Sequence, residues 1–341
     1  MHVIRETWML DTIFPARLIR AFGGSCNSML DSIHRTELAN TAVKLWHGVT
    51  GSLQRIGDSA NHVYSFIESG ETRYLRLISS YDRTKQQVEA ELDFIAYLNR
   101  GGVSAMLPLS SATGRLIEEL PLANGLLFAC VFEAAKGERF SYDPATSNKE
   151  HFRLRGRTLG QLHALSKGYA PSGSFRRFAW DEDKLLLDIN GFLPKSEKIV
   201  RREYDVLKER LKDYPKSSQM YGLIHGDFGE TNYRYQDAQL NIFDFDDCCY
   251  HWFAYDLAIT IYPHGWRREG LQLLDWLLEG YSENMQLDVK LADITMFCQW
   301  RLLYMFLVYA RKWGFENLSE QQAEWFARKR ENIARGYEWS A

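Results

Sequence analysis

Between residues 45 and 135 the chain alternates apolar and polar positions with the period of two that β-strands require. Short polar or glycine-containing turns separate the first runs, and a later run is apolar throughout. The predicted strands cover residues 53–56, 62–68, 72–78 and 126–132. Strands that follow one another through short turns pair antiparallel. We therefore predict an antiparallel sheet in this part of the chain.

Elsewhere the apolar residues recur every three to four positions, which is the helical period. The clearest case covers residues 85–98, where Val88, Leu92 and Ile95 share one face. Further helices are predicted over residues 152–166, 199–211, 272–281, 291–313 and 320–336. The helix over 291–313 is apolar almost all round, so we expect it to be buried. Strands first and helices afterwards indicate an α+β fold.

Composition and charge exclude several classes of protein. The 341 residues are 45% apolar and 25% charged, which is typical of a globular protein whose length suggests two domains. A net charge of -3 gives no broad attraction to nucleic acid, so we expect no such partner. Charged residues interrupt the apolar N-terminal segment, and no uncharged apolar window of about 18 residues occurs. We expect no membrane association, and a monomer or a homodimer.

The five cysteines do not form a metal or disulfide pattern. Their number is odd, and none shows the C-x-x-C spacing of zinc sites. Small buried thiols explain them best. A reducing, cytoplasmic location is therefore predicted.

A polar segment after a short apolar strand concentrates the residues of phosphoryl-transfer chemistry. Asp227 ends the sequence His225-Gly226-Asp227, Asn232 follows five residues later, and Asp244 comes after two further short strands. In protein kinases one Asp accepts the proton of the acceptor hydroxyl, an Asn further along holds Mg²⁺, and a later Asp holds the bridging Mg²⁺. Each piece alone is also an ordinary polar turn, but together and in this order they predict a kinase.

A predicted hairpin brings the metal ligands together. Residues 233–243 contain two alternating runs around a polar turn, and a hairpin returns its far end next to its near end. Asn232 and Asp244 are therefore expected to share one ion. If the strand continues, Asp246 points to the same side as Asp244, whereas Asp247 points to the opposite side. We therefore predict Asp246 as an additional metal ligand.

These motifs resemble those of the superfamily that contains aminoglycoside phosphotransferases, choline kinases and type II homoserine kinases. The resemblance rests on His225-Gly226-Asp227, Asn232, Ile242-Phe243-Asp244-Phe245-Asp246-Asp247 and Tyr255-Asp256-Leu257-Ala258. It implies a bilobal protein-kinase-like fold with an N-terminal extension (1–44), a nucleotide-binding N-lobe (45–135) and a catalytic, acceptor-binding C-lobe (136–341). It also implies that Asp227 is the catalytic residue and that Asp256 braces the catalytic loop.

The turn between the first two predicted strands is the candidate cover of the ATP phosphates. In kinases this turn approaches the phosphates through backbone N–H groups, which requires small side chains. Residues 57–61 carry one glycine in place of G-x-G-x-x-G, although the resembled superfamily often uses a polar loop that ends in Asn. We predict phosphate contacts from Gly57, Ser59 and Asn61, and the alternative is a plain hairpin turn.

Arg76 occupies the position on the third strand where kinases carry the lysine that pairs with the phosphates. Arginine binds phosphate bidentately and stays charged when desolvated. The alternative is a solvated strand charge. Glu91 and Glu89 compete as its ion-pair partner, and the resemblance favours Glu91. It also implies that the main chain of Glu133 and Ala135, at the hinge, contacts the adenine.

The sequence thus predicts an enzyme that uses ATP and Mg²⁺ to phosphorylate a hydroxyl of a small-molecule acceptor, with Asp227 as the base. Two alternatives remain. One is a protein Ser/Thr kinase on the same fold, and the other is a non-catalytic nucleotide-binding interaction protein.

Overall fold

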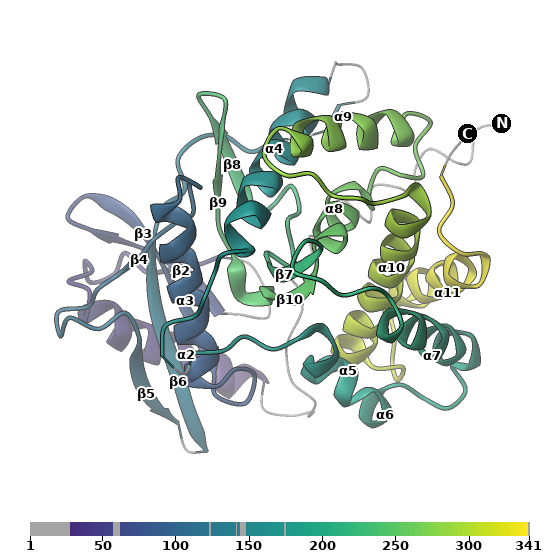
Figure 1. The fold of residues 1–341 in the computed structure, drawn as a ribbon. Coiled ribbons are helices and arrows are strands. Elements are labelled where there is room, and N and C mark those ends of the chain that lie inside the picture. Colours follow the sequence, from purple (N-terminus) through teal and green to yellow (C-terminus); the bar gives the residue numbers. More distant parts are fainter. Residues whose placement is uncertain are drawn as a thin grey trace.

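The computed structural model describes residues 28–56, 62–122, 124–140, 142–143, 148–173 and 175–339, with the side chains of these residues from position 36 onward. Within this part the chain forms two lobes of unequal size (Figure 1). The smaller lobe is built on a sheet, and the larger one is mainly helical. The predicted α+β, bilobal architecture is confirmed.

The small-lobe strands form one antiparallel sheet in the described part of the chain. They are β1 (Gln54–Arg55), β2 (His62–Glu68), β3 (Glu71–Ser79), β4 (Pro108–Leu109), β5 (Glu118–Leu122) and β6 (Gly125–Glu133). Their order is β1-β2-β3-β6-β4, and β5 also pairs with β6. The register places Arg76 between Val63 and Cys130, in the middle of the sheet. Alternation is a local property, which explains why the predicted strands match β2, β3 and β6 closely.

Two helices, α2 (Ser28–Lys44) and α3 (Lys85–Arg100), pack against the sheet (Figure 1). Ala42 of α2 belongs to an apolar cluster with Leu75 of β3. The next residue, Arg76, points to the other face and reaches α3. Part of the predicted N-terminal extension therefore contributes to the small-lobe core, and the expected boundary at residue 45 does not separate the two.

The large lobe contains the remaining elements. Its helices are α4 (Lys149–Ser166), α5 (Lys184–Leu187), α6 (Ile189–Phe192), α7 (Lys198–Lys212), α8 (Phe253–Ile261), α9 (Gly270–Ser282), α10 (Leu291–Trp313) and α11 (Glu320–Arg335). Its strands are β7 (Tyr221–Ile224), β8 (Tyr233–Gln236), β9 (Gln239–Ile242) and β10 (Cys249–Trp252), with short 3-10 turns η2 (Trp180–Glu182) and η3 (Phe245–Asp247). The strands β8 and β9 form the predicted hairpin, and β7 pairs with β10.

The long helix α10 has the predicted bounds, Leu291–Trp313. By length and composition it is the one helix in the described residues that could cross a membrane, but 67% of its apolar window is buried inside the protein. It packs against α8, α7 and α11. It is a core helix, as its all-round apolar pattern predicts.

The lobes are joined next to the site by main-chain hydrogen bonds. The amide of Met106 donates to the carbonyl of Ile242 at 2.9 Å, and the amide of Ile242 donates to the carbonyl of Ser104 at 2.8 Å. The segment after α3 thus runs beside β9. Consequently the chain that leaves β9, which carries Asp244, begins at the junction of the two lobes.

Candidate active site

A buried carboxylate of α8 fixes residues 225–232, which form the predicted catalytic loop. Asp256 accepts the amide of His225 at 2.8 Å and the amide of Gly226 at 2.9 Å. It also lies 3.1 Å from Nε2 of His163, a fully buried residue. Burial acts to raise the pKa of Asp256, but the hydrogen bonds from His163 and the loop amides outweigh it and lower that pKa. These contacts are the ones that the bracing role requires.

His225 and Gly226 pack closely against the chain that follows β9. Gly226 has φ of 81°, and a Cβ on it would lie 2.1 Å from the carbonyl oxygen of Asp247, so only glycine fits. The amide of Asp227 donates to Nδ1 of His225 at 3.3 Å, and the other ring nitrogen lies 3.2 Å from the carbonyl of Phe243. Burial lowers the pKa of His225. A neutral ring that accepts at Nδ1 and donates at Nε2 satisfies both contacts.

Asp227 is nearly buried, and each of its carboxylate oxygens has a donor. Oδ2 accepts Nδ2 of Asn232 at 2.8 Å, and Oδ1 accepts Nη2 of Arg301 at 2.6 Å. Burial raises the pKa of Asp227, the charge of Arg301 opposes that rise, and the carboxylates of Asp247 and Asp244 add to it. A carboxylate with a raised pKa is a stronger proton acceptor than an exposed one.

The β8–β9 hairpin brings the main chain just before Asp244 next to Asn232. The amide of Phe243, next to Asp244, donates to the carbonyl of Asn232 at 3.0 Å. Because Nδ2 of Asn232 donates to Asp227, its Oδ1 is the atom that can bind a cation, and Oδ1, which has two lone pairs, also accepts Oγ1 of Thr231 at 3.3 Å. The described residues contain no group of three His, Cys, Asp or Glu that could hold a metal. Mg²⁺ that is shared with phosphates needs only one or two protein oxygens, so this pair fits it.

The reasoning that selected Asp246 as an additional ligand is wrong, because residues 244–247 are not a strand. Asp244 is left-handed, with φ of 70°, and a 3-10 turn follows. Asp246 is buried, and its Oδ2 lies 3.4 Å from Nη2 of Arg83. Asp247 is more exposed and acts on the pKa of Asp227 more strongly than Asp244 does. Metal binding by Asp246 remains a prediction, but the strand geometry on which it rested is absent.

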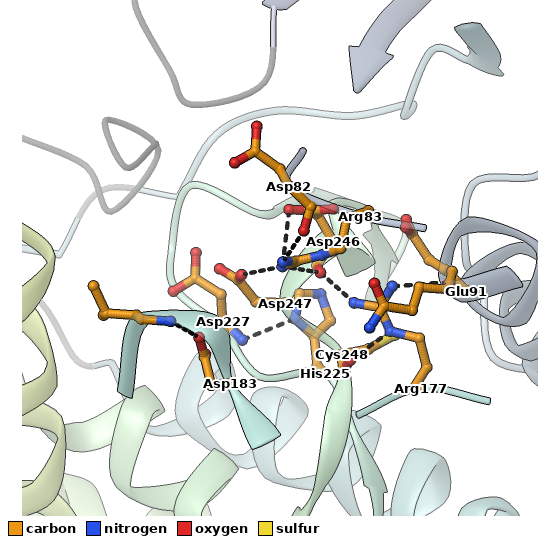
Figure 2. A network of polar contacts seen from close by, with 12 residues as sticks. Asp82, Arg83, Glu91, Arg177, Asp183, His225, Asp227, Asp246, Asp247 and Cys248 are labelled. Atoms are coloured by element: carbon orange, nitrogen blue, oxygen red, sulfur yellow. Dashed lines mark hydrogen bonds and ion pairs between the residues drawn. The ribbon is translucent and has the colours of Figure 1, made fainter. Parts of the chain in front are cut away.

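Two buried arginines hold this turn (Figure 2). Arg83 and Arg177 both donate to the main-chain carbonyl of Asp246, Arg83 at 3.0 Å. Arg177 also donates to the carbonyls of Cys248 at 2.7 Å and of Gln87, in the first turn of α3, at 2.9 Å. The guanidinium groups therefore tie the turn that follows Asp244 to the helix that carries Glu91.

Arg76 and Glu91 form an ion pair, with Nη2 2.7 Å from Oε1. Both side chains are almost completely buried, and burial raises the pKa of Glu91 while Arg76 opposes the rise. Nε of Arg76 and Oε2 of Glu91 are buried and lack a hydrogen-bond partner among the described residues. The predicted Arg76–Glu91 pair is present. It uses one of the five N–H donors of the Arg76 guanidinium group, so other donors of Arg76 can bind a phosphate.

The predicted contacts of the nucleotide with residues 57–61 and with the hinge stay predictions. Gly57, Ser59 and Asn61 lie outside the described residues. Glu133 ends β6, and Ala135 follows in the link between the lobes, which is where a hinge is expected. The amide of Glu133 donates to the carbonyl of Leu107 at 3.3 Å, so a contact of Glu133 with adenine would use its carbonyl.

Comparison with known proteins identifies the family. A model described as the phosphotransferase enzyme family matches residues 52–287, more than half of the chain. The chain belongs to this family. It is an enzyme, a kinase, and the resemblance found in its motifs is confirmed.

Named relatives of this phosphotransferase are small-molecule kinases. Amicoumacin kinase from Bacillus subtilis (strain 168) is 28% identical over 293 residues, which cover 82% of this chain and 86% of that protein. A solved amicoumacin kinase in complex with AMP-PNP, Ca2+ and Ami has a TM-score of 0.82 at 26% identity, with 90% and 96% of the chains covered. A microcompartment-associated aminopropanol kinase shares the fold, with a TM-score of 0.70 at 21% identity over 88% and 95% of the chains.

Sequence reasoning missed the arginines of this phosphotransferase site. Arg83, Arg177 and Arg301 are buried and contact residues far away in the sequence. Only Arg301 had a local signal, because it is the one charged residue between Asp293 and Arg311 in an otherwise apolar helix. A charge there requires a buried partner.

Asp256→Asn is expected to destabilise the phosphotransferase by about 3 kcal/mol, because it removes a buried carboxylate that accepts the amides of His225 and Gly226 and contacts His163. The lowered pKa of Asp256 means that this stability is present above the ordinary carboxyl pKa and is lost as the pH falls through the lowered value. Urea denaturation at pH 7 and below pH 4 measures both effects. An unchanged midpoint at pH 7 would contradict the bracing role.

Coupling between Arg76 and Glu91 is expected in a double-mutant cycle. Arg76→Met and Glu91→Gln each weaken nucleotide use, and the double variant loses less than the sum, with a coupling of about 1 kcal/mol or more. The measurement is kcat/KM for ATP. Glu89→Gln is the matched control, because Glu89 is the competitor on the same helix. Additive effects of Arg76→Met and Glu91→Gln would show that the pair is not used.

Proposed function

We propose that this kinase transfers the γ-phosphoryl group of ATP, as its Mg²⁺ complex, to a hydroxyl group of a small molecule, with Asp227 as the general base. The observation that carries the proposal is the geometry of Asp227. Its carboxylate is buried and held by the amide nitrogen of Asn232, so the amide oxygen of Asn232, which also accepts Oγ1 of Thr231 at 3.3 Å, is the atom of that side chain that would face a cation near Asp244. A proton acceptor and a metal site thus adjoin, as phosphoryl transfer requires.

The chain's own residues divide the work. Asp227 hydrogen-bonds the acceptor hydroxyl and takes its proton as the oxygen attacks. Asn232 and Asp244 hold Mg²⁺, which when bound supplies positive charge to the phosphate oxygens. Arg76, itself oriented by Glu91, adds a fixed charge for the α and β phosphates. Positioning and electrostatics therefore provide most of the rate.

For the acceptor, we propose a molecule that carries an amino group as well as a hydroxyl. One named relative is an aminopropanol kinase, whose name gives an acceptor with both groups, and the other is an amicoumacin kinase, which is also named for a small-molecule acceptor. We also place the enzyme in the cytoplasm, since its four described cysteines are free and buried thiols.

The test is a screen of amino alcohols, aminoglycosides and other hydroxylated metabolites for Mg²⁺-dependent release of ADP. The wild type is expected to release ADP with at least one acceptor, and Asp227→Asn is expected to release it at least about 10²-fold more slowly. Absence of acceptor-dependent release from the wild type, with AMP-PNP still bound, would favour a non-catalytic nucleotide-binding protein. Labelled protein bands after incubation with radioactive ATP and cell extract, absent with Asp227→Asn, would favour a protein kinase.

A further inference from the structure

A buried arginine of α10 contacts the catalytic carboxylate directly. Nη2 of Arg301 donates to Oδ1 of Asp227 at 2.6 Å, and the two side chains are only 7% and 8% exposed. The residues are separated by 74 positions in the sequence. Neither family motif nor strand pattern includes Arg301.

Stability does not explain this ion pair. A buried charge pair loses several kcal/mol of hydration per ion, and its replacement by apolar residues is often neutral or stabilising. The rest of α10 between Asp293 and Arg311 is uncharged, and an apolar side chain at position 301 would suit that helix. The arginine is therefore better explained by what it does to Asp227.

The guanidinium group of Arg301 is itself fixed by aromatic neighbours. It interacts electrostatically with Tyr255 of α8 and lies 5.9 Å from the ring centre of Tyr304, one turn along α10. The hydroxyl of Tyr304 donates to Asp183 at 2.9 Å, and Asp183 caps the start of α5. The position of Arg301 is thus set by several elements of the large lobe, and it does not depend on Asp227 alone.

We propose that Arg301 is a positioning residue for the general base. Asn232 holds Oδ2 of Asp227 and Arg301 holds Oδ1, so the carboxylate cannot rotate about its side-chain bonds without losing a donor. An oxygen accepts more than one hydrogen bond, so Oδ1 can still receive the acceptor hydroxyl. The inference rests on the proposed function, because it assigns the residue that aims its base.

Arg301→Met tests the proposal, because methionine fills the space of the side chain without its charge. We expect kcat to fall about 10²-fold, the size expected when a catalytic group is misplaced by about 1 Å. The KM for ATP should stay unchanged, because Arg301 does not reach the Arg76–Glu91 pair or the Asn232–Asp244 pair in any described contact. Arg301→Lys keeps a donor and should fall between the wild type and Arg301→Met.

The rates are measured as Mg²⁺-dependent ADP release, with 1-amino-2-propanol as acceptor and, separately, with water. Arg311→Met, at an exposed position of the same helix, is the matched control and should keep full activity. Guanidinium chloride at a non-denaturing concentration should restore part of the activity of Arg301→Ala and none of Asp227→Asn. A purely structural role would not give this rescue.

Three results are distinguishable. Full activity of Arg301→Met with an inactive Asp227→Asn overturns the positioning role and leaves the proposed function intact. Equal activity of the wild type and Asp227→Asn overturns the proposed function itself. Two other results also overturn the positioning role. One is a loss in Arg301→Met that appears in the KM for ATP. The other is a loss without guanidinium rescue in Arg301→Met when its thermal midpoint is lower than that of the double variant Arg301→Met/Asp227→Asn.

Discussion

Replacing Asp227 with asparagine lowers kcat by 10² to 10⁴-fold, which is the usual contribution of a general base and corresponds to about 3 to 5 kcal/mol. Asparagine has nearly the same shape, but it cannot accept the proton of the acceptor hydroxyl. Its amide oxygen can keep one of the two donors, Asn232 or Arg301, that hold the carboxylate. The fold and the metal site should therefore survive.

The measurement is kcat for acceptor-dependent ADP release, together with the affinity for AMP-PNP and Mg²⁺ by calorimetry. Nucleotide affinity is expected to stay within a small factor of the wild type, because the base acts only in the chemical step. Asp237→Asn is the matched control, since Asp237 lies exposed in the turn of the β8–β9 hairpin. A kcat of Asp227→Asn equal to that of the wild type would contradict the role of Asp227 as the general base.

Replacing Asp244 with asparagine lowers turnover by at least about 10²-fold and raises the Mg²⁺ concentration that is needed for it. The carboxylate is the charged ligand of the predicted site, and metal stabilisation of phosphoryl charge is worth several kcal/mol. Asparagine is the suitable replacement because Asp244 has φ of 70°, a conformation that asparagine adopts more readily than alanine. The change thus removes the charge and keeps the backbone.

Titration of the rate with Mg²⁺, and of AMP-PNP affinity with and without Mg²⁺, separates this variant from the Asp227 variant. The wild type should bind AMP-PNP more tightly with Mg²⁺, and Asp244→Asn should lose that difference. Asp213→Asn, at the exposed end of α7, serves as the control. An unaltered response to Mg²⁺ in Asp244→Asn would place the metal elsewhere.

The parts of the site that follow from local sequence were predicted well. The hairpin β8–β9 depends on alternation and a polar turn, and it brings the main chain just before Asp244 next to Asn232. The strand that carries Arg76 and the helix that carries Glu91 also follow from their periods. The period did not choose between Glu89 and Glu91, and the family resemblance implied the Arg76–Glu91 pair that the structure contains.

Irregular segments could not be predicted in the same way. The strand-phase argument failed at Asp246 because the chain leaves β9 through a left-handed residue and a 3-10 turn. Arg83 and Arg177 hold that turn by binding main-chain carbonyls, which carry no sequence signal. Main-chain carbonyls of any residue type could accept these hydrogen bonds, so no sequence pattern predicts that Arg83 and Arg177 bind this turn.

The sequence by itself determined the two-lobed α+β architecture, the family and the order of the chemical groups Asp227, Asn232 and Asp244. The strands, the helices and the order of the groups depend on side-chain periodicity and motif spacing, which are properties of short segments, and the two lobes and the family were implied by the resemblance of those motifs. Only the tertiary structure decided that Arg301 meets Asp227 and that α2 belongs to the small-lobe core. Such contacts join segments far apart in the chain, and packing and the need to pair buried charge select them.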